Sequence, residues 1–274
     1  MLTAAYAVAY TNGMQQVKAG KKSGKQYLKM LSYMKHYTAY SVEESRFTFS
    51  ANVTNFTLHD SNLPQYKAAH VEGLASGVMC SYFAPNGVSS CGNPYLLNQL
   101  IRKEWARPDA VVMSDCSAVG NMRSNVMKLN DTQASAQAMN AGLDIYGGWG
   151  DNLWGQGDLA KAVTEGLTDE KTITASTRRT LMQKMKVGLF DPPEDSPWSD
   201  LGADALNSTY AQRVAYEAAL QGMVRAGLAV VIAPASVVFR HCWRHLSAPR
   251  PHACPPLVLS ALVGVAAGTG VAEK

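Results

Sequence analysis

One aspartate stands where a parallel α/β fold places catalytic carboxylates. Asp115 follows the apolar run Ala110–Met113 and one serine. Side chains at the carboxyl ends of buried parallel strands face a shared crevice, and a carboxylate there can act as a nucleophile or in proton transfer. The alternative is that Asp115 caps the helix after it, because aspartate is a favoured cap. Its position alone leaves both roles open.

Four further polar residues are candidates for binding or catalysis. Lys35 and His36 are adjacent at the end of another possible strand, and Arg46 follows in an acidic, loop-like stretch. Their ordinary interpretations are a surface pair and an exposed loop arginine. Asp144 lies within an apolar run and fits a capping or turn role equally well.

Short apolar runs alternate with amphipathic stretches along the chain. The runs Gly77–Tyr82, Ala110–Met113 and Gly142–Tyr146 predict buried strands. Gln26–Ala39 predicts a helix, or a helix running into a strand. Helix patterns cover Pro64–Glu72, Asn93–Glu104, Gln133–Asn140, Leu159–Gly166 and Thr174–Val187.

This alternation predicts parallel βαβ units and an α/β fold. About three or four strands are visible, whereas a closed (β/α)₈ barrel has eight strands in about 250 residues. The pattern therefore fits either part of a barrel or a small open sheet.

Composition excludes several classes of protein. Of 274 residues, 47% are hydrophobic and 17% are charged, which is typical of a globular chain. The net charge is +4, and the short basic stretch Lys18–Lys25 predicts a solvated loop. The uncharged stretch Leu257–Val271 is shorter than the roughly 20 residues of a membrane helix. We expect neither a nucleic-acid nor a membrane partner.

The cysteines give no metal signature. There are five, without a CxxC pair, and the group His241, Cys242 and His245 lacks a positioned fourth ligand, so we expect no metal site. Cys80 and Cys91 flank a turn-like stretch and either close a small loop or remain a free buried pair.

The ends of the chain carry mixed signals about secretion. Met1–Gly13 does not read as a signal peptide because it lacks a basic start. Sequons at Asn52, Asn55, Asn130 and Asn207 favour a secretory history. Residues 225–274 are rich in proline and show no sustained period, which predicts a disordered tail.

A set of ordered motifs resembles one enzyme family. The stretch Met79–Asn93 is similar to the loop motif of the β-xylosidase branch of glycoside hydrolase family 3, where Met-Cys-Ser-Tyr-Asn leads to Asn-Gly-Val-Pro-Ser-Cys. Lys35-His36-Tyr37 resembles the family's Lys-His-Phe. Further matches follow in the family's order at Leu96-Leu97, Glu104-Trp105, Val111–Cys116, Ala141–Asp144, Gly188–Pro193 and Ala218–Gly222.

The resemblance implies a retaining glycosidase that acts on terminal β-D-xylosyl residues of an oligosaccharide or aryl β-glycoside. Asp115 would be the nucleophile. Lys35, His36 and Arg46 would bind sugar hydroxyls, Tyr82 would line the pocket, and no metal or organic cofactor is implied. By the same resemblance, the protein would be secreted and would take part in xylan breakdown.

The resemblance also implies how the chain is organised. Residues 1–200 would form the C-terminal part of a TIM-type (β/α)₈ barrel that is incomplete because the family's early strands are missing. Residues 201–224 would begin a linker or second domain, and 225–274 would be a tail unrelated to the family. The family's acid/base glutamate comes from a second domain that this chain lacks.

Three readings of function remain. The chain is a β-xylosidase-type hydrolase, a non-catalytic fragment or sugar-binding remnant, or an open-sheet interaction module in which Asp115, Lys35 and His36 do not converge. Local departures from the family occur at Phe83, where asparagine is usual, and at Ser117, where glycine is usual.

Overall fold

The computed structural model describes residues 1–124, 126–148 and 152–223. Its contacts divide the chain into two units, residues 1–203 and 204–274. The described part of the second unit holds helix α7 (Thr209–Gly222), which begins where the hydroxyl of Ser208 accepts a hydrogen bond from the Ala211 amide. The expected tail, 225–274, lies outside the described residues.

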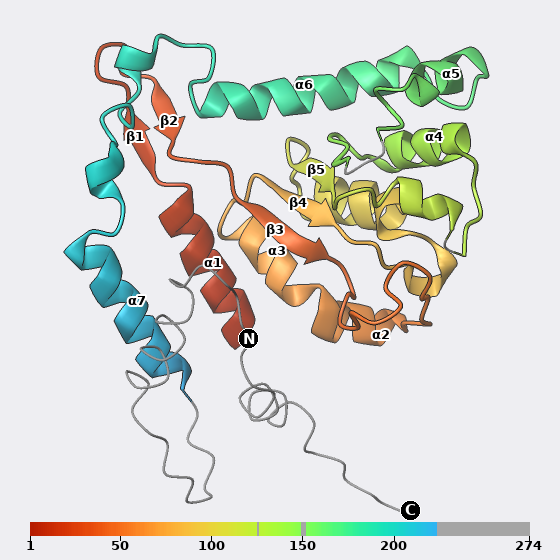
Figure 1. The fold of residues 1–274 in the computed structure, drawn as a ribbon, viewed down its shortest axis with the longest axis horizontal. Helices are drawn as coiled ribbons and strands as arrows, with labels where there is room; N and C mark the ends of the chain where they lie inside the picture. Colours follow the sequence, from red (N-terminus) through yellow and green to blue (C-terminus); the bar gives the residue numbers. More distant parts are fainter. Residues whose placement is uncertain (125, 149–151, 224–274) are drawn as a thin grey trace, which may run out of the picture. The chain divides into compact units, whose positions relative to one another are not determined.

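A parallel sheet lies at the centre of the first unit, which confirms the predicted α/β class (Figure 1). It consists of β3 (Tyr33–Tyr37), β4 (Gly77–Cys80) and β5 (Val111–Ser114), in the order β3-β4-β5. A Cβ atom on Gly77 would lie 1.9 Å from the Val111 carbonyl oxygen, so β4 and β5 approach too closely for any side chain there.

The predicted strand Gly142–Tyr146 is reduced to one bridge, between Met113 and Ile145. Beyond that bridge the amide of Gly147 donates to the Ser114 hydroxyl, 2.8 Å away, instead of continuing the backbone ladder. The chain therefore leaves the sheet after a single parallel contact.

Five of the helical predictions correspond to observed helices. They are α3 (Pro64–Val71), the π-helix η4 (Tyr95–Glu104), α4 (Asp131–Ala141), α5 (Asp158–Thr164) and α6 (Glu170–Lys186). Helix α4 starts at a capping box of Asn130 and Gln133 and ends at Gly142, whose φ of 110° suits glycine.

The helix predicted within Gln26–Ala39 is wrong, whereas the strand that the alternative interpretation placed after it is observed. This segment forms β2 (Gln26–Leu28), which pairs with β1 (Val17–Ala19), and then β3. Pairing with neighbouring strands and burial of Tyr27 and Tyr37 outweigh its local helix formers. Helix α1 (Leu2–Met14) precedes this hairpin and packs against α3.

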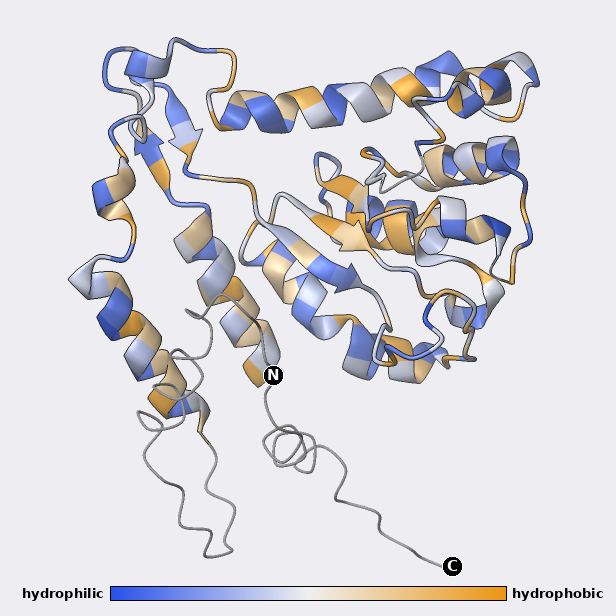
Figure 2. Ribbon diagram, in the orientation of Figure 1, coloured by the Kyte–Doolittle hydropathy of each residue, from blue (hydrophilic) through white to orange (hydrophobic). Residues whose placement is uncertain are grey.

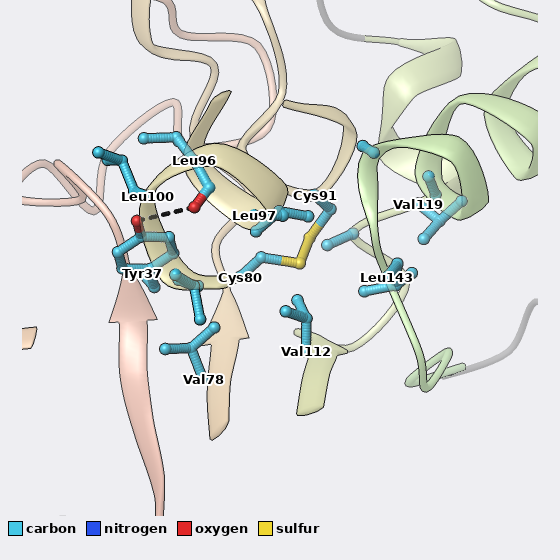
Figure 3. Packing of buried hydrophobic residues seen from close by; sticks show 14 of the residues in the cluster. Tyr37, Val78, Cys80, Cys91, Leu96, Leu97, Leu100, Val112, Val119 and Leu143 are labelled. Carbon is cyan, nitrogen blue, oxygen red and sulfur yellow. Dashed lines mark hydrogen bonds between the residues drawn. A yellow bond between two sulfur atoms is a disulfide. The ribbon is translucent and has the colours of Figure 1, made fainter. Parts of the chain in front are cut away.

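The hydrophobic core lies between the sheet and η4. Val78 and Val112 contribute from the strands, and Leu97, Leu100 and Leu143 pack with them (Figure 3). Hydropathy colouring shows the same concentration of apolar residues at β5 and beside it (Figure 2). Within this core Cys80 and Cys91 form a disulfide, which resolves the open alternative for this pair.

Asp144 lies beside β5 and joins three elements of the fold. Its carboxylate accepts from Arg102 of η4 at 2.7 Å, from Arg179 of α6 at 2.8 Å and from the amide of Val112 in β5 at 2.9 Å. The carboxylate side chain is fully buried, and burial lowers the pKa of Arg102 to about 10. Asp144 is thus an ionic junction of the fold and not only a turn residue.

Candidate active site

Asp115 and His36 meet at the carboxyl ends of two strands of the sheet. Asp115 directly follows β5, and its amide donates to the Cys80 carbonyl at the end of β4, 3.0 Å away. Its Oδ1 accepts from the Cys116 amide at 2.7 Å, while Oδ2 lies 3.5 Å from Nε2 of His36 in β3. The Asp115 side chain is 13% exposed, so it is largely but not completely buried.

Tyr82 fixes the backbone beside this carboxylate. Its hydroxyl donates to the carbonyl of Cys116 at 2.8 Å, and its ring packs edge-on against Phe47 with 4.9 Å between the centroids. Burial and the neighbouring Asp115 carboxylate raise the pKa of Tyr82 to about 12. Tyr82 is therefore a neutral hydrogen-bond donor at ordinary pH.

Arg46 lies over two aromatic rings. Its guanidinium carbon is 4.7 Å from the centroid of Phe47 and 5.1 Å from that of Tyr82. It also donates to the hydroxyl of Tyr40 at 3.1 Å and forms an ion pair with Glu43. These contacts hold a fixed positive charge close to the aspartate without burying it.

These residues line a pocket of about 650 Å³. Of the five site residues predicted from sequence, four lie in its wall: His36, Arg46, Tyr82 and Asp115. The fifth, Lys35, is exposed and does not line it. The peptide bond that joins Lys35 to His36 is cis.

Much of the pocket wall comes from the segment just after Asp115, which the sequence analysis did not predict. Besides Phe47, the further lining residues all belong to this segment: Cys116, Ser117, Gly120, Asn121, Arg123 and Ser124. This segment carries no helical or strand period, so only its closeness to Asp115 in the chain could have indicated it.

The described lining suits attack by a carboxylate on a polar ligand. It offers one carboxylate, several cationic or hydroxyl groups and aromatic faces. No cluster of three or more potential metal ligands occurs in the part of the chain that the structure describes, and the His241–Cys242–His245 group falls outside that part. Across the same residues no helix is long and apolar enough to cross a bilayer.

Comparison with known proteins identifies relatives of one kind. The family profile "Glycosyl hydrolase family 3 N terminal domain" matches residues 1–182. A β-xylosidase/α-L-arabinofuranosidase of Medicago sativa subsp. varia is 34% identical over 230 residues, which cover 82% of this chain. An exo-1,4-β-xylosidase of Emericella nidulans is 34% identical over 203 residues, or 72% of this chain.

A solved structure agrees with these matches. A family 3 exo-β-xylosidase, in complex with a xylobiose aziridine activity-based probe, superposes with a TM-score of 0.71 at 32% identity over 81% of this chain. The matched part is 28% of that protein, as it is 29% of the Medicago enzyme and 26% of the Emericella enzyme. This chain therefore spans less than a third of the length of these relatives.

Proposed function

The chain belongs to glycosyl hydrolase family 3, and on this premise we propose that it serves in the hydrolysis of terminal, non-reducing β-D-xylosyl or related β-glycosyl residues. Substrates would be xylan-derived oligosaccharides or aryl β-glycosides. The single observation that carries the proposal is the partly buried Asp115 carboxylate, 3.5 Å from His36 in the wall of a 650 Å³ pocket.

The proposed chemistry is a retaining double displacement. Oδ2 of Asp115 attacks the anomeric carbon as the bond to the leaving oxygen breaks, which forms a covalent glycosyl-enzyme. Water then attacks the same carbon, the bond to Asp115 breaks and restores the carboxylate, and one proton of the water passes to the acid/base group or to solvent, which leaves its hydroxyl on the sugar. No metal or organic cofactor takes part in either step.

The cationic residues are assigned to substrate binding. His36 and Arg46 would bind sugar hydroxyls, because donors held in place position the ring for in-line attack. Lys35 can join them only by moving its side chain toward the pocket, since it is exposed in this structure.

The acid/base role needs a second carboxyl group. Within the described lining Asp115 is the one carboxylate, so we assign this role to a group from another part of the enzyme or a further segment. General-acid help is worth about 10²–10⁴-fold in rate. This chain alone should therefore favour substrates whose leaving groups need no proton.

We propose that the chain is organised in three parts. Residues 1–200 would be the C-terminal part of a barrel, 201–224 the start of a linker or second domain, and 225–274 a segment foreign to the family. The secretory assignment is also a proposal. It is supported by the Cys80–Cys91 disulfide, because disulfides persist in oxidising compartments.

A second candidate is a non-catalytic fragment that retains a sugar pocket. It is favoured by the single carboxylate of the described lining. Incubation with 2,4-dinitrophenyl β-D-xyloside separates the two candidates, because this leaving group needs no acid. Release of β-xylose as the first anomer, seen by NMR, supports the hydrolase, whereas α-xylose or no turnover contradicts it.

A further inference from the structure

One wall of the pocket becomes aromatic and open away from the carboxylate. The hydroxyl of Tyr82 donates to the carbonyl of Cys116, the residue after Asp115, while the Tyr82 ring packs against Phe47. Tyr82 is 8% exposed, whereas Phe47 lines the same pocket and remains 46% exposed. Phe47 is therefore the outer part of a wall whose inner part adjoins the proposed nucleophile.

The loop that carries Phe47 is anchored close by in the chain. Phe83, which stands where the family usually has asparagine, is 3% exposed, and the centroid of its ring lies 5.5 Å from that of Phe49. The hydroxyl of Ser50 donates to the carbonyl of Ala84 at 2.7 Å. Because these contacts already hold the loop, a ligand that binds to Phe47 loses little affinity in ordering it.

The outer end of the pocket is the place for a leaving group. In the proposed reaction the sugar is attacked at Asp115, and the group beyond the broken bond then departs into solvent. Phe47 offers this group a ring without a hydrogen-bonding atom. An aromatic leaving group gains stacking there in addition to burial of apolar surface, whereas the hydroxyls of a sugar would lose water without gaining a partner from this ring.

We infer that Phe47 makes the site selective for β-glycosides whose leaving group is an aryl ring and not a second sugar. The ligand class is a β-glycoside of a phenol. Phe47 acts on the leaving group, beyond the bond that breaks, so it determines specificity and takes no part in the chemical step. This inference rests on the proposed glycosidase function of the pocket.

Three ligands test the inference by calorimetric binding to the full chain. They are phenyl 1-thio-β-D-xyloside, methyl 1-thio-β-D-xyloside and S-linked xylobiose, whose sulfur links resist hydrolysis during the measurement. The phenyl glycoside is expected to bind about tenfold more tightly than the methyl glycoside, as stacking and apolar burial at one ring predict. S-linked xylobiose is expected to bind more weakly than the phenyl glycoside.

Variants assign the preference to Phe47. Phe47→Ala is expected to bring the affinity for the phenyl glycoside close to that for the methyl glycoside, which itself stays unchanged because its leaving group is too small to cover the ring. Phe47→Tyr keeps the ring and is expected to retain the preference. Phe56→Ala is the matched control, since Phe56 is 77% exposed on α2 (Asn55–Thr57) and does not line the pocket.

The outcomes separate this inference from the proposed function. If the phenyl and methyl glycosides bind equally, or S-linked xylobiose binds as tightly as the phenyl glycoside, the aryl selectivity is overturned and the glycosidase proposal stands. A preference that survives Phe47→Ala, or an equal loss of affinity for both monosaccharide ligands in that variant, overturns the assignment to Phe47. If no glycoside binds, both proposals fail.

Discussion

The Asp115 carboxylate lies 3.5 Å from Nε2 of His36. Asp115 directly follows β5, whereas His36 belongs to β3, and β4 lies between these two strands. Parallel strands bring their carboxyl ends to one edge of a sheet, so residues distant in sequence converge there. This convergence is the opposite of what an open-sheet interaction module predicts for Asp115 and His36. Lys35, in contrast, is exposed and does not line the pocket, so it does not converge with Asp115 and His36 in this structure.

Tyr82→Phe should slow the first chemical step. The substitution keeps the ring against Phe47 but removes the hydrogen bond to the Cys116 carbonyl, which is 2.8 Å long. Without this hydrogen bond the activation free energy for forming the glycosyl-enzyme would rise by about 1 kcal/mol, which lowers the rate about fivefold. Stopped-flow measurement of dinitrophenolate release checks this rate.

Tyr95→Phe is the control for this variant, because the hydroxyl of Tyr95 forms a hydrogen bond with the exposed His59 and Tyr95 is not among the residues that line the pocket. A Tyr82→Phe protein that binds substrate more weakly but reacts at the full rate would show that the hydroxyl contacts sugar instead of positioning the backbone.

Asp144→Asn should destabilise the first unit strongly. The change leaves Arg102 and Arg179 without their buried counter-charge. Breaking a buried pair on one side costs about 3–5 kcal/mol in the free energy of unfolding. Urea unfolding measures this loss. Asp200→Asn is the control, because Asp200 pairs with Lys21 and its side chain is 82% exposed. This variant should lose at most about 1 kcal/mol in the free energy of unfolding. Equal losses in the two variants would contradict the role of Asp144 as a junction.

His70 should make the fold less stable as the pH falls. It is fully buried, its Nδ1 donates to the Tyr66 carbonyl, and burial lowers its pKa from 6.5 to about 4. Nearby Arg107 lowers this pKa further, while Asp109 opposes the shift. Between the two values the unfolded chain binds a proton that the folded chain does not, so stability is lost as the pH falls from about 6.5 to about 4, by about 3 kcal/mol in total.

The measurement is urea unfolding of the wild type and of His70→Gln between about pH 7.5 and 4.5. The wild type should lose stability across this range more steeply than the variant, since glutamine does not titrate. His59→Gln serves as the control at an exposed histidine. Parallel curves for wild type and His70→Gln would contradict the assignment to His70.

The cysteines should differ in their reaction with iodoacetamide. Cys116 is a free, exposed thiol, whereas Cys80 and Cys91 are joined and buried. Peptide mapping of the unreduced protein should find Cys116 alkylated and the other two linked. Removal of the disulfide by the double substitution Cys80→Ala/Cys91→Ala should lower the free energy of unfolding by about 2–4 kcal/mol. Alkylation of Cys80 without reduction would refute the disulfide.

The sequence predicted the elements that depend on local pattern. Strands β4 and β5 and the helices α3, η4, α4, α5 and α6 follow from apolar runs and helical spacing. Asp115 became a candidate because it follows the predicted strand β5. The sequence left the segment of β3 open between a helix and a helix running into a strand, because its local helix formers compete with pairing to β4. It could not predict Arg123 in the pocket wall, since irregular backbone carries no period. The role of Asp144 was equally hidden, because its two arginines lie on separate helices.

The most direct test of the central claim is covalent labelling of Asp115. The full chain is incubated with 2-deoxy-2-fluoro-β-D-xylosyl fluoride, whose leaving group needs no acid and whose fluorine slows release of the intermediate. The account predicts a mass increase on the peptide that contains Asp115, which Asp115→Asn abolishes. A cooperatively folded chain that gains no label, or gains it at another residue, would contradict the assignment of Asp115 as the nucleophile.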